Sequence, residues 1–290
     1  MKATVTEGQR ELVALYDATL ERLTIPYQIQ WVDTGYGKTH VISAGTVGAA
    51  PILILHGSAS NAVGCWPLIN GLASKYRVYA PDAPRQLGKT EPFRLSTKNA
   101  DYGKWLEEVL DHLEIKLTSV VGFSFGGWMA CKLAIYAPER IRTVVLLSPV
   151  GVAAFRVRYW IQAPVLLLKM LVSQTDKSIR RFAAFIAGPT ATKEIIEELV
   201  VSAKVFLKNF YMQGTPHRLK KKDLKKLVAP TMLLVGRHDI FCEPEMIVSR
   251  IKENLPKAQT EIIEDVGHVI YFERPELINA RIIEFFESDF

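Results

Sequence analysis

The chain has 290 residues, 49% of them hydrophobic and 23% charged, a composition typical of a globular protein with a large core. Its 36 basic and 30 acidic side chains leave a net charge of +6, which is too modest to predict binding to nucleic acid. The most apolar stretch, residues 159–172, contains polar residues and a proline and is too short to cross a bilayer, so we expect no membrane partner.

The N-terminus and the cysteines favour a cytoplasmic location. The chain opens with polar residues and has no apolar segment followed by a small-residue cleavage site, so we expect no signal peptide. Cys65, Cys131 and Cys242 are odd in number and far apart, as expected of reduced thiols. Because they form no metal-binding or redox spacing, we expect no metal and no cofactor.

The first quarter of the chain predicts one helix followed by strands. Residues 6–24 have apolar side chains at helical spacing, and Thr6 with Gln9 forms a capping-box pattern. Residues 27–32 and 38–43 predict two short strands with a glycine turn between them. Residues 51–55 form a continuous apolar run, as expected of a strand covered on both faces.

Strands and helices then alternate. Helices are expected at 66–74, 97–113, 128–136, 244–255 and from 275 onward, and strands at 77–80, 118–123, 141–147, 230–235 and 260–263. This alternation predicts an α/β fold whose mostly parallel, eight-stranded sheet has helices on both faces.

The alternation is interrupted between residues 152 and 226, where helical periodicity occurs without a convincing buried strand. Helices are expected at 155–172 and 193–210, and the basic stretch 218–226 predicts the solvated face of a short helix. We therefore expect a core of residues 1–151 and 227–290 with a helical cap, residues 152–226, inserted after the sixth strand.

A nucleophile is predicted between the strand 118–123 and the helix that follows. The sequence Gly122-Phe-Ser124-Phe-Gly126-Gly127 places one serine at the apex of a strand–turn–helix. A serine held in a strained backbone there needs flanking glycines to avoid clashes with Cβ atoms. An ordinary glycine-rich turn gives the same pattern, so the assignment depends on finding a base, an acid and oxyanion donors.

His268 is the predicted base. Serine needs an adjacent general base, itself oriented by a carboxylate. Among the six histidines, His268 follows the late strand 260–263, so its loop opens at the carboxyl edge of the sheet where Ser124 is expected. Asp239 is the predicted acid, because it follows the strand 230–235. The other strand end between Ser124 and His268, at Ser148, has no carboxylate. Glu243 and Asp265 are the alternatives.

Two backbone amides are predicted to bind the oxyanion of a tetrahedral intermediate. Phe125, directly after the nucleophile, supplies one. The other is expected in the loop His56-Gly57-Ser58-Ala59, where Ser58 is the first choice and Ala59 the second. His56 is expected to hold this loop in shape.

With these motifs in order, the sequence resembles the α/β-hydrolase superfamily over essentially its whole length. The matching segments are His56-Gly57, Gly122–Gly127, Ala137–Arg140, Gly236–Asp239 and Gly267-His268. The resemblance implies the α/β-hydrolase fold and a serine hydrolase that uses Ser124, Asp239 and His268.

Two further segments bear on this resemblance. The segment Asp82–Thr90 is similar to a loop of the family that reads Asp-x-x-Gly-x-Gly-x-Ser, but Arg85 replaces its first glycine. The segment Tyr36–Gly45, together with the N-terminal helix, resembles bacterial carboxylesterases.

A serine nucleophile favours acyl transfer to water. We expect a small-molecule substrate, a small to medium and apolar carboxylic ester, cleaved through an acyl-enzyme. Thioesters, lactones and carbon–carbon bonds are alternatives. Carbon–carbon bond hydrolases of this fold typically carry an aromatic residue after the histidine, where this chain has Val269. A ligand-binding protein without activity is a further alternative, because fold alone does not guarantee catalysis.

Substrate contacts are expected from the oxyanion loop, the elbow, the cap and the residue after the base. The predicted residues are Ala59, Trp128, Tyr159, Trp160, Phe206 and Val269. A monomer or a homodimer is expected.

Overall fold

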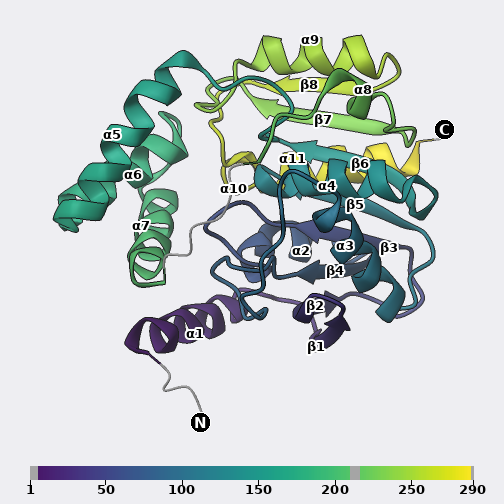
Figure 1. Cartoon of the computed structure of the whole chain (residues 1–290), viewed down its shortest axis with the longest axis horizontal. Coiled ribbons are helices and arrows are strands. Elements are labelled where there is room, and N and C mark those ends of the chain that lie inside the picture. The colour runs from purple at the N-terminus through teal and green to yellow at the C-terminus, as the bar shows by residue number, and fades with distance from the viewer. Residues whose placement is uncertain (1–5, 210–215, 289–290) are drawn as a thin grey trace.

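The computed structural model describes residues 6–209 and 216–288, without the side chains of residues 157–160. Its centre is one sheet of eight strands in the order β1-β2-β4-β3-β5-β6-β7-β8 (Figure 1). The pairs β1–β2 and β2–β4 are antiparallel, and all the others are parallel. The strands are β1 (Tyr27–Thr34), β2 (Gly37–Ala44), β3 (Pro51–Leu55), β4 (Arg77–Pro81), β5 (Thr118–Phe123), β6 (Ile141–Leu147), β7 (Thr231–Gly236) and β8 (Gln259–Ile263).

The helices confirm the predicted alternation and extend it. They are α1 (Glu7–Leu20), α2 (Trp66–Leu72), α3 (Asp101–His112), α4 (Phe125–Tyr136), α5 (Val157–Ser173), α6 (Asp176–Ala187), α7 (Lys193–Lys208), α8 (Lys221–Leu224), α9 (Pro244–Asn254), α10 (Ile270–Glu273) and α11 (Pro275–Glu287), with 3₁₀ turns η1 (Val63–Cys65) and η2 (Pro138–Arg140). Residue 210, the predicted end of the helix 193–210, lies outside the described residues. Every helix within the described ranges is too short or too polar to span a bilayer.

The sheet is covered on both faces because its central strands are apolar on both sides. Along β3, Leu53 and Leu55 join the cluster under α3, α4, α8 and α9. Ile52 and Ile54 join the opposite cluster, under α2, α10, α11 and the end of α1. Alternate residues of a strand point to opposite faces, so a continuous apolar run is what a sheet buried on both sides requires. This confirms the predicted α/β fold with helices on both faces.

Between β6 and β7 the chain forms the helices α5, α6 and α7, which lie beyond the carboxyl ends of the parallel strands (Figure 1). They pack on a small core of their own, built from Met170, Ile179, Ala183 and Val200. Helix α6 was not among the individually predicted helices. It begins at the cap Thr175, whose side chain accepts from the amide of Ser178.

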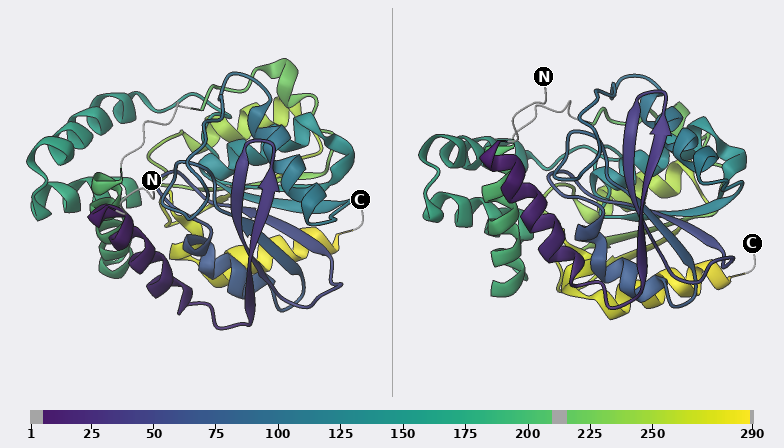
Figure 2. Two further views of the ribbon diagram at one scale, coloured as in Figure 1. Left: turned by 60° about the horizontal axis from the view of Figure 1, so that its bottom comes forward. Right: turned by 90° about the horizontal axis from the view of Figure 1, so that it is seen from below.

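Helix α1 lies against α7 rather than only against the sheet (Figure 2). The predicted capping box of Thr6 and Gln9 is present at its start. Lys208 at the end of α7 pairs with Glu11 at 2.5 Å, and the side chain of Asn209 donates to the carbonyl oxygen of Gly8 at 2.8 Å. A further ion pair joins Arg22 to Glu198. The first helix of the chain therefore contacts both the cluster on one face of the sheet and helix α7.

Candidate active site

Ser124 stands at the turn between β5 and α4 with φ 51° and ψ −113°, a conformation that residues other than glycine rarely adopt. Its amide donates to the carbonyl oxygen of Leu147 on the neighbouring strand at 2.9 Å. Its own carbonyl oxygen accepts from the amide of Gly127 at 3.0 Å. The predicted helix start at Trp128 is therefore wrong, because these bonds let α4 begin at Phe125, directly after the serine.

Gly126 allows the elbow to touch the end of β3. A Cβ atom at Gly126 would lie 1.9 Å from the carbonyl oxygen of Leu55 and 2.8 Å from that of His56. No side chain fits in that space. The close approach brings the loop that follows His56 against the start of α4.

Three of the predicted site residues form one buried chain of hydrogen bonds. His268 Nδ1 lies 2.8 Å from Asp239 Oδ2, and His268 Nε2 lies 3.0 Å from Ser124 Oγ. A carboxylate can only accept, so Nδ1 carries the hydrogen and Nε2 is left to accept from the serine hydroxyl. Ser124, Asp239 and His268 are 7%, 1% and 3% exposed. This geometry lets the imidazole take the hydroxyl proton as the oxygen attacks an acyl carbon.

Asp239 is fixed by the backbone of its own loop. Its other carboxylate oxygen, Oδ1, accepts from the amides of Phe241 at 2.7 Å and Cys242 at 3.3 Å. Arg156, in the segment leading to α5, donates from Nη1 to the Asp239 carbonyl oxygen at 2.6 Å. The Asp239 side chain is therefore held in place before any substrate arrives.

The two alternative acids are placed elsewhere. Glu243 binds the guanidinium of Arg156 with both carboxylate oxygens, and this bond lowers the pKa of Glu243. Asp265 is exposed in the loop ahead of His268. Neither carboxylate is bonded to the imidazole of His268 in the structure.

The predicted oxyanion donors, Ser58 and Phe125, lie on the two segments that Gly126 brings together. Within the described residues, neither amide makes a hydrogen bond, so both are free to bind an oxyanion. The amide of Ala59, the second choice, is occupied, since it donates to Gln86 Oε1 at 2.7 Å. Ala59 also has φ 52°, so Gln86 stabilises a left-handed backbone directly after Ser58.

His56 and Asp82 hold the oxyanion loop from beneath. His56 Nε2 accepts from the amide of Ala83 at 2.9 Å, while Nδ1 lies 2.8 Å from the Gly57 carbonyl oxygen. Asp82 accepts from the amide of Ala62 at 2.7 Å and pairs with His40 at 3.0 Å. All these contacts are buried. His56 thus joins the two loops in its neutral form, because a protonated Nε2 could not accept.

This arrangement predicts a loss of stability at acidic pH. Burial lowers the pKa of His56, because the charged imidazolium would lose its hydration. For Asp82, burial alone would raise the pKa, but the hydrogen bond and charge of His40 outweigh it and lower the pKa. In both cases the folded state binds fewer protons than the unfolded chain, so stability falls as the pH falls.

The His56 contribution is present above the ordinary histidine pKa of about 6.5 and is lost below it. We therefore expect the free energy of unfolding, measured with denaturant, to fall between pH 7.5 and pH 5.5, and His56→Gln to flatten that slope. The exposed histidine variant His112→Gln is the matched control and should keep it. Equal slopes in wild type and His56→Gln would contradict this interpretation.

Two of the residues predicted to contact substrate are fully or almost fully buried. Trp128 has no exposed surface, stacks on Phe125 and donates from Nε1 to the His217 carbonyl oxygen at 2.9 Å. Val269 is also buried in the core, with only 4% of its surface exposed. Both side chains pack in the core clusters on either face of the sheet, and their contact with substrate stays a prediction.

Four other residues are predicted to contact substrate: Ala59, Phe206, Tyr159 and Trp160. Ala59 is half-buried beside Ser58, and Phe206 is half-buried on α7. Tyr159 and Trp160 belong to the first turn of α5, and their side chains lie outside the described part of the structure. These four stay predictions.

Sequence reasoning missed three side chains around the site: Arg156, Gln86 and Phe241. The ring of Phe241 lies 4.2 Å from that of His268, centre to centre, and 6.3 Å from that of Phe155. It forms an apolar wall beside the imidazole. Phe241 follows the predicted acid Asp239 by two residues, and this closeness in sequence could have indicated a place beside the site. No motif in the sequence around Arg156 or Gln86 indicates that these residues lie near the site.

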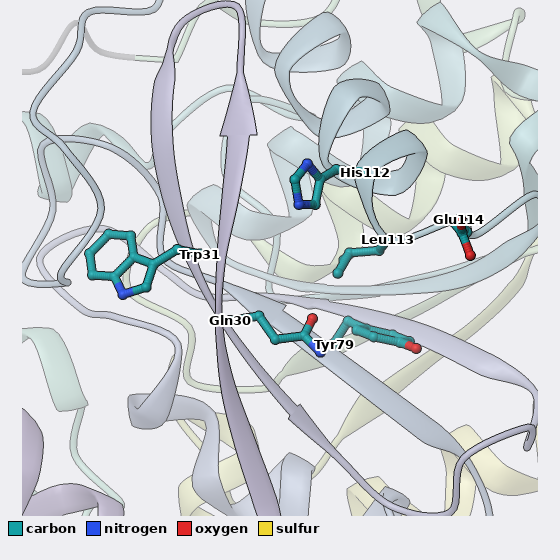
Figure 3. A pocket seen from close by; sticks show the side chains of 6 residues that line it. All are labelled: Gln30, Trp31, Tyr79, His112, Leu113 and Glu114. Atoms are coloured by element: carbon teal, nitrogen blue, oxygen red, sulfur yellow. The ribbon is translucent and has the colours of Figure 1, made fainter.

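One surface depression lies away from Ser124, between the β1–β2 edge and the end of α3 (Figure 3). Its volume is about 490 Å³, and it is lined by Gln30, Trp31, Tyr79, His112, Leu113 and Glu114. None of the predicted site residues belongs to it.

The sheet order, the strained serine and the His268–Asp239 pair define a class of protein. Residues 52–281 match the model of the alpha/beta hydrolase family, and the chain belongs to that family.

Among known proteins, the chain is similar to two from Bacillus subtilis (strain 168). It is 27% identical over 296 residues to the "uncharacterized carboxylesterase nap", covering 94% of this chain and 91% of the relative. It is 26% identical to "carboxylesterase YbfK", covering 98% and 95%. The crystal structure of carboxylesterase CesB (YbfK) superposes with a TM-score of 0.87 at 25% identity, over 98% of this chain and 100% of that one.

Proposed function

We propose that this protein is a serine hydrolase that cleaves small to medium, apolar carboxylic esters through an acyl-enzyme. The observation that carries the proposal is the buried hydrogen-bond chain from Asp239 through His268 to Ser124. The similarity to Bacillus subtilis carboxylesterases over nearly the full length supports an ester as the substrate class.

In the first half-reaction, Ser124 Oγ attacks the acyl carbon and its proton passes to His268 Nε2. The carbonyl oxygen becomes an oxyanion, which the amides of Ser58 and Phe125 stabilise. His268 then gives its proton to the departing alkoxide, so an alcohol leaves and an ester to Ser124 remains. Asp239 holds the imidazole in the required tautomer and stabilises the imidazolium.

In the second half-reaction, a water molecule takes the place of the alcohol. It loses a proton to His268 Nε2 and attacks the acyl carbon of the Ser124 ester. Collapse of the second oxyanion breaks the bond to Ser124 Oγ, which recovers its proton from His268. The products are a carboxylic acid, an alcohol and the free enzyme.

The helices between β6 and β7 would form the cap over this site. They belong to residues 152–226, the segment predicted to be a cap inserted into the core of residues 1–151 and 227–290. The aromatic side chains of Phe155, Phe206 and Phe241 would give the acyl or alcohol group an apolar surface. Burial of apolar groups is the main source of affinity for such a substrate. A cytoplasmic location and a monomer or homodimer fit the same proposal.

A panel of p-nitrophenyl esters from acetate to decanoate tests the substrate class. We expect hydrolysis of short and medium chains, with kcat/KM rising as the acyl chain lengthens, because each buried CH₂ contributes about 0.8 kcal/mol. The rise should stop where the pocket is filled. Ser124→Ala is the control and should leave every ester intact.

An activated phosphonate separates the remaining alternatives. Labelling of Ser124 without hydrolysis of any ester in the panel would favour a thioesterase, a lactonase or a carbon–carbon bond hydrolase. If wild type is neither labelled nor active while an unrelated esterase is, a ligand-binding protein would be the better description.

A further inference from the structure

Glu273, the last residue of α10, bridges two parts of the chain that are distant in sequence. Its Oε1 atom accepts from the amide of Gly267, directly before His268, at 2.8 Å. Its Oε2 atom accepts from the hydroxyl of Thr190, in the connection between α6 and α7, at 2.5 Å. Within the described residues Glu273 makes no ion pair. In the described part of the chain, the carboxylate of Glu273 accepts only the two hydrogen bonds of this bridge.

The same two segments are in direct backbone contact. A Cβ atom on Gly267 would lie 2.4 Å from the carbonyl oxygen of Ala187, the last residue of α6. Both Gly267 and Ala187 are buried. The end of α6 therefore rests on the peptide that precedes His268, and there is no room for a side chain between them.

The position of this peptide determines whether His268 can act. The imidazole must reach Asp239 on one side and Ser124 on the other, at 2.8 Å and 3.0 Å. A small rotation of the Gly267 peptide would move the ring away from at least one partner. Misplacement of a catalytic group by about 1 Å can cost about a hundredfold in rate.

We propose that Glu273 is a positioning residue, through which Thr190 in the α6–α7 connection fixes the backbone in front of His268. The hydrogen bonds of the His268 imidazole go to Asp239 and Ser124 and not to Glu273, so Glu273 acts through the Gly267 amide. Hydrolysis is then efficient only while α6 and α7 are docked on the His268 loop. This inference rests on the proposed function, because it assigns His268 the role of base.

Thr190→Val tests the bridge from its far end. It removes the hydroxyl that donates to Glu273 but keeps the size of the side chain. We expect kcat for a p-nitrophenyl ester to fall about tenfold, with KM within about twofold of wild type. Thr190→Ser keeps the hydroxyl and should restore kcat to within about twofold.

Thr192→Val is the matched control, two residues away in the same connection. Thr192 caps α7 by accepting from the amide of Ile195 and has no bond to Glu273. This variant should lower Tm, because the cap is lost, and leave kcat within about twofold of wild type. Glu273→Ala, which removes both bonds of the bridge, should lower kcat more than Thr190→Val does.

Three results would overturn the proposal: unchanged kcat in Thr190→Val, an equal loss in Thr190→Ser, or an equal loss in Thr192→Val. The proposed function fails separately, if wild type does not hydrolyse the ester or if Ser124→Ala hydrolyses it equally well. An active, Ser124-dependent wild type with an unaffected Thr190→Val variant would overturn the positioning role alone.

Discussion

Replacing Ser124 by alanine is expected to lower kcat for ester hydrolysis by about a millionfold, the loss seen when the nucleophile of a serine hydrolase is removed. Without Oγ no acyl-enzyme forms, and His268 Nε2 loses the hydroxyl that lies 3.0 Å away. Steady-state kinetics with a p-nitrophenyl ester measures the loss. The variant should fold, because alanine keeps the Cβ atom and the backbone bond from residue 124 to Leu147.

Ser58→Ala is the matched control for this experiment. Ser58 is expected to act through its backbone amide, which alanine retains, so kcat should stay within a few-fold of wild type. A covalent phosphonate should label wild type and Ser58→Ala but not Ser124→Ala. Labelling of Ser124→Ala at the wild-type rate would show that another residue is the nucleophile.

Replacing Asp239 by asparagine is expected to lower kcat by about ten-thousandfold without unfolding the protein. Oδ1 accepts from the amides of Phe241 and Cys242, so the asparagine oxygen should take that place. Its NH₂ group then faces His268 Nδ1, which must accept instead of donate. The hydrogen of the imidazole moves to Nε2, and Nε2 can no longer accept the proton of Ser124.

Glu243→Gln is the variant to compare with Asp239→Asn, because Glu243 is the alternative acid. It removes a carboxylate from the same loop and weakens the bond to Arg156 but leaves the chain from Asp239 to Ser124 intact. We expect a loss of less than about tenfold in kcat/KM. If Asp239→Asn keeps the wild-type rate while Glu243→Gln loses it, the role of acid belongs to Glu243.

Most of the fold could be predicted from the sequence because its signals are local. The mostly apolar segments at β3, β5, β6 and β7 indicate strands buried on both faces, and all four are found. Helix ends were less predictable. Helix α4 begins three residues before Trp128, since the start depends on the strained turn at Ser124 rather than on helical periodicity.

The meeting of the candidate site residues could also be predicted from local signals, because each of the three residues follows a predicted strand. Ser124, Asp239 and His268 follow β5, β7 and β8, and the carboxyl ends of these strands meet at one edge of the sheet. The structure brings the three side chains into hydrogen-bonding distance. Their catalytic roles stay predictions until the variants are measured.

The supporting side chains could not be predicted, because their partners are far away in the chain. Arg156 reaches the Asp239 carbonyl across 83 residues, and Thr190 reaches Glu273 across the same interval. Trp128 and Val269 are buried in the core clusters although they stand close to Ser124 and His268 in the sequence. Adjacency in sequence to Ser124 and His268 does not say whether a side chain faces the site or the core.

The contact between α1 and α7 has a consequence for the order in which the molecule assembles. Lys208 and Glu11 are 197 residues apart in the chain, and Arg22 and Glu198 are 176 apart. During synthesis α1 emerges first, but this face of the helix lacks its partner until more than two thirds of the chain has been made. Contacts so distant in sequence form late and slow folding. The polar contacts of α1 with α7 therefore stay unmade on most of the nascent chain, and α1 should be among the last elements to become protected from hydrogen exchange.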